Sequence, residues 1–85
     1  MRNIENYKRI FVDTLLLKKE EVENASILDT EQWDSLEHFN LVNQIEETFG
    51  VKFSNEDIID FVSYHSGIEI LKKYGVILEI VWITI

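Results

Sequence analysis

Apolar side chains recur every three or four residues along much of this chain, which is the spacing that gives a helix one apolar face. No proline occurs among the 85 residues, so the residue that most strongly interrupts helices is absent. The spacing and the flanking turn residues predict helices over residues 3–17, 35–49, 56–61 and 66–74. We therefore expect an all-α fold, a small four-helix bundle of three main helices plus a short third helix.

Polar residues and glycine mark where these helices begin and end. Asn3 is the expected N-cap of the first helix, and Asp34 and Glu37 have the spacing of a capping box at the start of the second. Gly50 is expected to end the second helix in a left-handed conformation. Residues 66–69 have the sequence Ser-Gly-Ile-Glu, which predicts another capping box before the last helix.

The apolar stripes predict which side chains form the core. The stripe on the second helix consists of Leu36, Phe39, Val42, Ile45 and Phe49, and Leu41 flanks it. The residues expected to line the bundle interior are Leu41, Val42, Ile45, Ile59, Phe61, Ile68 and Leu71. Residues 20–34 lack the helical pattern, and we expect a loop that Ile27, Leu28 and Trp33 pin to the core.

The last ten residues differ from the rest of the chain. Residues 76–85 are apolar and largely β-branched, with Glu79 as their one charge, a composition that favours a strand over a helix. We assign residues 1–75 to a helical domain and residues 76–85 to a hydrophobic C-terminal tail of unknown role. Residues 77–85 are expected to contribute hydrophobic packing or self-association of an otherwise monomeric protein.

The acidic residues are concentrated in the middle of the chain. The net charge is −8, yet residues 1–19 hold five basic and two acidic side chains, while residues 20–60 hold twelve acidic side chains and only Lys52 as a base. Such a balance argues against binding a nucleic acid, whose phosphates need clustered Lys and Arg. An acidic region of this kind instead favours a basic protein partner.

Other classes are excluded by what the sequence lacks. No apolar run approaches the roughly 18 residues of a membrane span. The absence of cysteine excludes disulfides and thiolate metal sites, and the opening residues do not have the pattern of a signal peptide, so we expect a cytoplasmic protein. His38 and His65 lack a carboxylate arrangement typical of a metal site.

The residues that suggest a specific function are Asp34-Ser35-Leu36, between the long loop and the second helix. Alone, this tripeptide is typical of an ordinary helix cap. In the wider context Trp33-Asp34-Ser35-Leu36, continuing through residues 41–51 and 58–71, resembles the acyl carrier protein family of phosphopantetheine-carrying domains. The resemblance spans roughly residues 4–75, and the ending Leu71-Lys72-Lys73-Tyr74-Gly75-Val76 is similar to that of stand-alone bacterial carriers.

The resemblance implies a carrier and not an enzyme. Ser35 would be esterified to 4′-phosphopantetheine by a phosphopantetheinyl transferase that uses coenzyme A, and the terminal thiol would hold an acyl group as a thioester. Asp34 is similar to the aspartate that helps to place metal and serine in the transferase complex. Acyl-loading and acyl-transfer enzymes with basic docking patches are the other implied partners. The implied recognition set is Leu36, Glu37, Glu46, Glu47, Glu56 and Asp57, with Asp60 adding charge.

The residues themselves fit this role and leave two alternatives open. Ser35 at a helix N-terminus offers a phosphodiester the positive end of the helix dipole and free backbone N–H groups. A serine–histidine enzyme using His38 is disfavoured because the chain is too small for a site that excludes water. The other alternative is a small acidic helical adaptor that binds a basic protein without a cofactor.

Two expectations concern the cargo. Neutral Asn40, Asn43 and Gln44 stand where carriers of fatty-acid synthesis are often more acidic or apolar, which favours a dedicated biosynthetic pathway, such as one for a surface polysaccharide or another secondary product. The interior stripe is expected to be a packed core, with large phenylalanines filling the space that an acyl chain would need.

Overall fold

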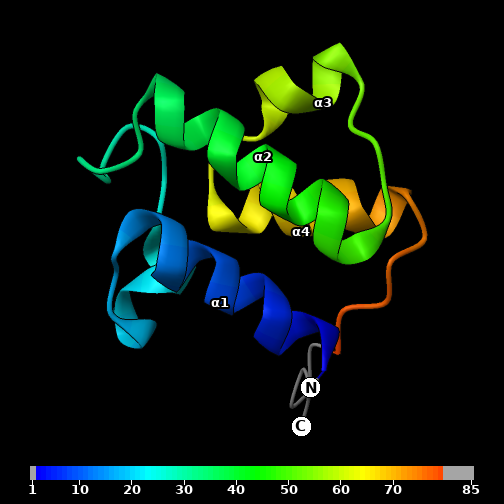
Figure 1. Cartoon of the computed structure of the whole chain (residues 1–85), viewed down its shortest axis with the longest axis horizontal. Coiled ribbons are helices and arrows are strands. Elements are labelled where there is room, and N and C mark those ends of the chain that lie inside the picture. Colours follow the sequence, from blue (N-terminus) through cyan, green and yellow to red (C-terminus); the bar gives the residue numbers. More distant parts are fainter. Residues whose placement is uncertain (1, 80–85) are drawn as a thin grey trace, which may run out of the picture.

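The computed structural model describes residues 2–79. Its elements, in chain order, are α1 (Asn3–Leu15), the 3-10 helix η1 (Lys19–Asn24), α2 (Ser35–Phe49), α3 (Asn55–Asp60) and α4 (Tyr64–Lys73). α1 and α2 run in opposite directions (Figure 1). In the same view α4 lies behind α2, and the short α3 lies beside α2. The predicted all-α fold of three main helices and a short third one is confirmed, with η1 as an additional short element inside the predicted loop.

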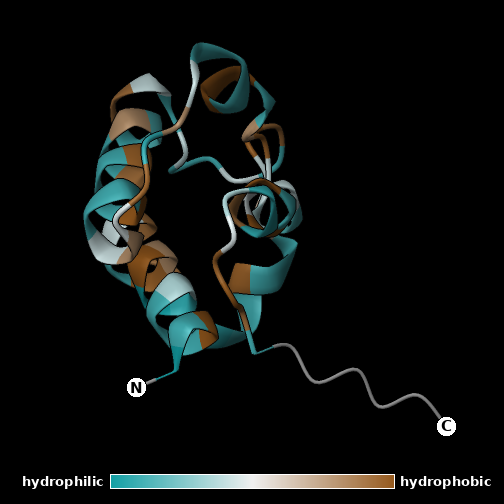
Figure 2. Cartoon of the chain, turned by 90° about the vertical axis from the view of Figure 1, so that its right-hand side faces the viewer, coloured by the Kyte–Doolittle hydropathy of each residue, from teal (hydrophilic) through white to brown (hydrophobic). Residues whose placement is uncertain are grey.

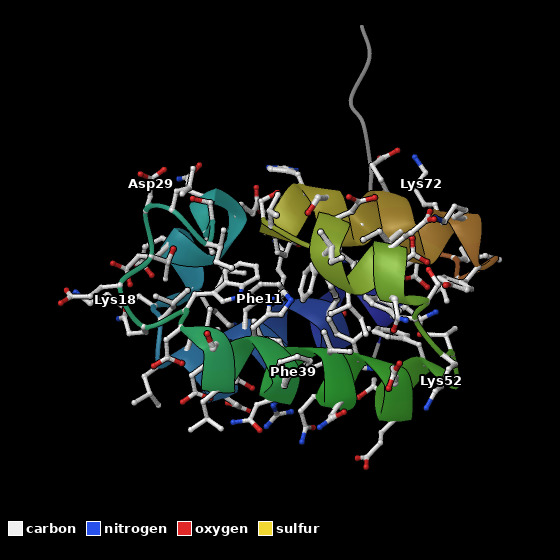
Figure 3. The ribbon with its side chains drawn as sticks, turned by 90° about the horizontal axis from the view of Figure 1, so that it is seen from above. Phe11, Lys18, Asp29, Phe39, Lys52 and Lys72 are labelled. Carbon is white, nitrogen blue, oxygen red and sulfur yellow. The ribbon has the colours of Figure 1, made fainter. Side chains whose placement is uncertain are left out.

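Amphipathic helices enclose one apolar core. Hydrophilic and hydrophobic stretches alternate along each helix (Figure 2), as expected where one face is buried and the other is solvated. Phe11 lies in the middle of the bundle, whereas the labelled charged residues Lys18, Asp29, Lys52 and Lys72 lie at its rim (Figure 3). Among the described helices, none is long and apolar enough to cross a membrane.

The first helix ends before its predicted boundary. Leu16 adopts a left-handed conformation with φ of 57° and is 82% exposed, which ends α1 at Leu15. The reversal turns Leu17 back into the core, where it is 9% exposed. Burial of Leu17 and of Val22 in η1 therefore replaces the last helical turn that the spacing predicts.

The start of α1 also differs from the prediction. Arg2, and not Asn3, precedes the helix, and the Glu5 carboxylate accepts a hydrogen bond from the Arg2 backbone N–H at 3.3 Å. The Asn3 side chain donates instead to the Ile77 carbonyl at 2.8 Å. Its amide is therefore used to hold the C-terminal segment and not to cap the helix.

The last helix begins two residues earlier than predicted. Ser63 is its N-cap: the Ser63 hydroxyl accepts from the Ser66 N–H, and the Ser66 hydroxyl accepts from the Ser63 N–H, both at 3.0 Å. Ser66 thus closes a capping box that Ser63 opens. The earlier start also buries Tyr64, which is 2% exposed.

Several predicted core positions are confirmed and others are wrong. Leu41, Val42, Ile45, Phe61, Ile68 and Leu71 are buried as predicted. Ile59 is 73% exposed, because α3 places its neighbour Ile58 against the core instead. In the loop, Trp33 is buried, but Leu28 is 92% exposed and Ile27 is also exposed, so Trp33 alone of these three pins the loop.

The described part of the tail packs back onto the domain. Val76 and Leu78 are partly buried against the core, and the Glu79 carboxylate accepts a hydrogen bond from the Ile4 N–H at 3.2 Å. This bond satisfies a first-turn donor of α1. Hydrogen bonds from the backbone N–H of Glu79 itself and, to a smaller extent, from that of Ile4 lower the pKa of the Glu79 carboxyl. Residues 80–85 lie outside the described residues, so self-association through the tail stays a prediction.

Candidate functional site

Ser35 is the first residue of α2 and is exposed. Asp34 is the N-cap of this helix, and its Oδ1 accepts a hydrogen bond from the Glu37 N–H at 2.9 Å. The Glu37 carboxylate accepts from the Asn40 side chain at 2.8 Å and not from the Asp34 backbone, so only one half of the predicted capping box forms. Because Asp34 caps the helix, the hydroxyl of Ser35 is not needed for capping. Ser35 is exposed to solvent.

The segment on both sides of Ser35 is fixed to the core by Trp33 and His38. The Trp33 Nε1–H donates to His38 Nδ1 at 3.0 Å, and His38 Nε2 lies 2.9 Å from the Ile58 carbonyl oxygen. Since an indole N–H only donates, Nδ1 must accept, so Nε2 holds the proton and donates to Ile58. His38 therefore joins the loop before Ser35, the first turns of α2 and the middle of α3.

This arrangement decides between two interpretations of His38. Both ring nitrogens have partners within the bundle, so neither is free to accept a proton from the Ser35 hydroxyl. The serine–histidine enzyme is thereby disfavoured by geometry as well as by size. Its half-buried ring packs against Trp33 and Phe61, so His38 is a structural residue of the bundle.

The loop that leads to Ser35 is held by the connection between α3 and α4. The Ile27 N–H donates to the Val62 carbonyl at 2.8 Å, and the Tyr64 N–H donates to the Ala25 carbonyl at 3.0 Å. These two bonds form an isolated antiparallel bridge between Ser26 and Ser63. The end of α3 and the start of α2 are consequently positioned by the same segment.

Exposed apolar side chains lie on the two helices that meet at this point. Leu36 and Phe39 on α2 are 70% and 56% exposed, and Ile59 at the end of α3 is 73% exposed. Val62, in the following connection, is 44% exposed. We call Leu36, Phe39, Ile59 and Val62 the apolar surface. Leu36 was expected both in the apolar stripe of the second helix and at a partner surface, whereas Phe39 and Ile59 were expected in the core.

Some of the acidic residues predicted to contact partners are exposed, whereas others accept hydrogen bonds within the domain. Glu47, Glu56 and Asp60 are exposed. Glu46 is half-buried, and its Oε2 accepts from the Phe53 N–H at 2.8 Å, which holds the turn after α2. Glu46 thus has a structural use in addition to its charge.

Asp57 does not belong to a partner surface. It is 3% exposed, and its carboxylate accepts hydrogen bonds from the Lys73 ammonium and the Tyr74 hydroxyl at the end of α4. The Asp57 backbone N–H donates to the hydroxyl of the N-cap Ser54 at 3.1 Å. The bonds from Lys73 and Tyr74 lower the pKa of Asp57 to about 2. Asp57 therefore binds α3 to α4, and its burial leaves little of its carboxylate for a partner.

The sequence is similar to that of a known acyl carrier protein. No family model matches the sequence. An acyl carrier protein from Buchnera aphidicola subsp. Baizongia pistaciae (strain Bp) is 33% identical over 76 residues, which cover 87% of this chain and 97% of that protein.

The chain belongs to the acyl carrier protein family. Because the match covers 87% of this chain, it includes Ser35 and the loop before it. Membership supports a carrier that is not itself a catalyst. Within residues 2–79 no group of three or more His, Asp or Glu side chains is arranged to hold a metal ion.

Two features of this site suit an acyl carrier protein: Ser35 is exposed, and the segment around it is held to the core by Trp33 and His38. The structure brings Asp34, Ser35 and Leu36 together at the start of α2, next to the apolar surface, and separates them from Asp57. The fixed loop presents the serine hydroxyl at a defined place, and no neighbouring base activates it. Chemistry at this hydroxyl would therefore depend on groups that another protein supplies.

Proposed function

We propose that Ser35 is the attachment site of a 4′-phosphopantetheine arm and that the protein delivers an acyl group held as a thioester on that arm. The observation that supports this most is the exposed Ser35 hydroxyl at the first position of a helix capped by Asp34. A transferase would join the serine oxygen to the phosphopantetheine phosphate of coenzyme A, releasing adenosine 3′,5′-bisphosphate and the hydroxyl proton.

The residues at the start of α2 fit the phosphodiester that would result. The Glu37 N–H is satisfied by Asp34, and the His38 N–H donates to the Asp34 carbonyl at 2.8 Å. Within the described residues the N–H groups of Ser35 and Leu36 have no backbone or side-chain acceptor. These two donors and the helix dipole favour a negative charge beside Ser35.

Partner enzymes would dock on the apolar surface and its exposed acidic neighbours. Leu36 and Phe39 offer apolar contact beside the arm, while Glu47, Glu56 and Asp60 would attract a basic patch. Glu37 and Glu46 add negative charge while also holding local structure. The exposed and neutral Asn40, Asn43 and Gln44 support a dedicated pathway.

Incubation with coenzyme A and a broad-specificity phosphopantetheinyl transferase tests the attachment. Intact-mass measurement should show one added arm, and Ser35→Ala should show none. Ser54→Ala is a matched control, because Ser54 is also an exposed serine at a helix start, where its hydroxyl accepts from the Asp57 N–H at 3.1 Å. That variant should still be modified, and modification of Ser35→Ala would refute the assignment.

The adaptor alternative makes opposite predictions. It requires that Ser35→Ala leaves partner binding and function intact, while charge reversal of an exposed acid such as Glu47 abolishes them. Glu47 is the better choice for this comparison than Glu46, whose carboxylate holds the Phe53 N–H. Loss of function in Ser35→Ala with a folded protein would exclude the adaptor.

A further inference from the structure

The interior of the bundle is filled by aromatic rings. Six aromatic side chains are buried there, each 4% exposed or less, and neighbouring ring centroids lie 4.9–6.1 Å apart. These residues are Tyr7, Phe11, Trp33, Phe53, Phe61 and Tyr64. Such spacing is ordinary edge and tilted contact between rings, so the cluster is close-packed.

Phe61 occupies the centre of this cluster. It is fully buried, and its ring centroid lies 5.2 Å from that of Trp33, 5.5 Å from that of His38 and 6.1 Å from that of Phe11. It follows directly after α3, so it fills the space between α2, α3 and α4. An apolar group sheltered between these helices would have to take the place of the Phe61 ring.

The contact between α1 and α4 leaves no spare volume either. A methyl group placed on Gly67 would lie 2.1 Å from the Tyr7 hydroxyl oxygen and 2.7 Å from a Phe61 ring carbon. The Tyr7 hydroxyl cannot retreat freely, because it donates to the Tyr64 carbonyl at 2.7 Å. Only glycine fits at this position in α4.

The short α3 is held in place by polar contacts at both ends. Its first turn is bound to α4 through Asp57, which contacts Lys73 and Tyr74. Its second turn is bound to α2 through the Ile58 carbonyl and His38. Admitting a long apolar chain between α2 and α3 would require displacing Phe61 or breaking one of these contacts.

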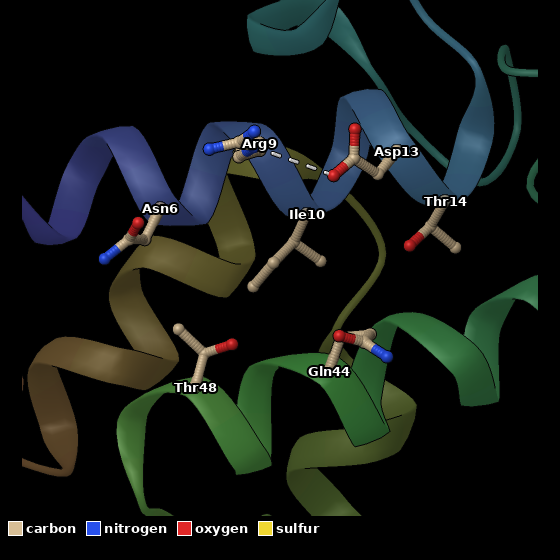
Figure 4. A pocket seen from close by; sticks show the side chains of 7 residues that line it. All are labelled: Asn6, Arg9, Ile10, Asp13, Thr14, Gln44 and Thr48. Atoms are coloured by element: carbon tan, nitrogen blue, oxygen red, sulfur yellow. Dashed lines mark ion pairs between the residues drawn. The ribbon is translucent and has the colours of Figure 1, made fainter. Parts of the chain in front are cut away.

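Four cavities bordered by described residues open to the surface outside the aromatic cluster. One of about 420 Å³ lies between α1 and α2 (Figure 4), where Arg9 and Asp13 form an ion pair at 3.8 Å and Ile10 is the single apolar residue of the lining. Its α2 residues, Gln44 and Thr48, follow Ser35 by nine residues or more, about 14 Å along the helix. The others lie against the outer face of α1, at the place where α1 begins and α2 and α4 end, and between α3 and α4. None of these four is an apolar tunnel leading from Ser35.

We propose that this carrier keeps its cargo outside the helical bundle, and that the cargo is an acyl group too short or too polar to need shelter from water. This inference rests on the proposed attachment at Ser35. A long hydrocarbon on an exposed arm would keep much of its length in water, where each methylene is unfavourable. A small or polar acyl group has no such requirement, and the bundle presents it directly to partner enzymes.

The test compares carriers loaded with acyl groups of different length. A promiscuous transferase attaches acetyl-, octanoyl- and dodecanoyl-phosphopantetheine to Ser35 from the matching acyl-coenzyme A, and mass confirms each product. The melting temperature is then measured for all three. We expect octanoyl and dodecanoyl carriers to melt within about 1 °C of the acetyl carrier, and a rise of about 4 °C or more with chain length would overturn the inference.

An engineered cavity supplies the matched comparison. Phe61→Leu should open space at the centre of the cluster, lower the melting temperature of the acetyl carrier, and make the dodecanoyl carrier several degrees more stable than the acetyl carrier. If Phe61→Leu fails to fold, NMR of the unchanged protein provides the test. The ring signals of Tyr7 and Phe61 should be the same in the acetyl and dodecanoyl forms, and shifts confined to the dodecanoyl form would overturn the inference.

The outcomes also separate the two proposals. A protein that gains no arm refutes the attachment at Ser35 and the cargo inference with it. An arm combined with chain-length-dependent stability refutes the cargo inference alone.

Discussion

Replacing Asp57 with asparagine should destabilise the protein, because Asp57 is a buried carboxylate whose charge is used. The side chain is 4% exposed and accepts from both Lys73 and Tyr74. These bonds bring its pKa from an ordinary 3.8 to about 2, which corresponds to about 2 kcal/mol of folding free energy at neutral pH. Because the Lys73 side chain is 62% exposed and screened by solvent, we expect a loss of about 1–2 kcal/mol in Asp57→Asn.

The pH dependence gives the sharper test. A carboxylate whose pKa is lowered by folding stabilises the protein above its unfolded pKa, near 4, and this contribution is lost as the pH falls through the folded pKa, about 2. The difference in unfolding free energy between the unchanged protein and Asp57→Asn should therefore be largest at pH 6–7 and should shrink between about pH 4 and pH 2.

Urea unfolding followed by far-ultraviolet circular dichroism measures this difference at each pH. Asp60→Asn is the matched control, since Asp60 lies on the same helix, is exposed, and should change stability by less than about 0.5 kcal/mol. Equal stability of the two variants at pH 7 would refute the reasoning. So would an Asp57→Asn deficit that stays the same at pH 7 and at pH 2.

Three further variants test other parts of the fold. Gly67→Ala should lose about 1–3 kcal/mol in urea unfolding, because the new methyl group collides with the Tyr7 hydroxyl; stability equal to or above that of the unchanged protein would contradict the packing. His38→Phe should lose about 1–3 kcal/mol, because the Trp33 N–H loses its acceptor, and it should accelerate amide hydrogen exchange in α3, because the Ile58 carbonyl loses its donor; unchanged exchange would show that α3 does not depend on the bond to Ile58. Truncation after Val76 should lower the melting temperature by a few degrees through loss of the bonds at the start of α1, and light scattering on the same sample tests whether the tail promotes self-association.

The helix that presents Ser35 could be predicted from the sequence because its signals are local. Asp34 accepts from the N–H three residues later, and Gly50 adopts a left-handed φ of 66°, so both ends of α2 depend on residues within a few positions. The start of α4 was placed too late, because the pattern Ser66-Gly67-Ile68-Glu69 was interpreted as the opening of the helix. Ser63 is the N-cap instead, and the earlier start buries Tyr64.

The exposed face of α2 could not be predicted because the apolar spacing was misleading. A helix turns by about 100° per residue, so a repeat of three falls short of a full turn by about 60° each time. Three such steps carry the stripe from Leu36 halfway around the helix to Ile45. Ile45 therefore faces the core while Leu36 faces solvent, with Phe39 between them on the way.

The role of Asp57 could not be predicted from the residues next to it in the sequence. In the sequence it is one of two acids in the first turn of a short helix, equivalent to Glu56 beside it. Only the packing of α3 against α4 brings Lys73 and Tyr74 to its carboxylate from sixteen and seventeen residues away. A buried ion pair and an exposed docking charge cannot be separated by residue type alone.

The central claim concerns the hydroxyl of Ser35, and the mass of the protein after incubation with coenzyme A and a phosphopantetheinyl transferase tests it most directly. The account predicts a gain of one phosphopantetheine arm, located on the peptide that contains Ser35 and absent from Ser35→Ala. A folded protein whose mass does not change, or an arm found on a different serine, would contradict it.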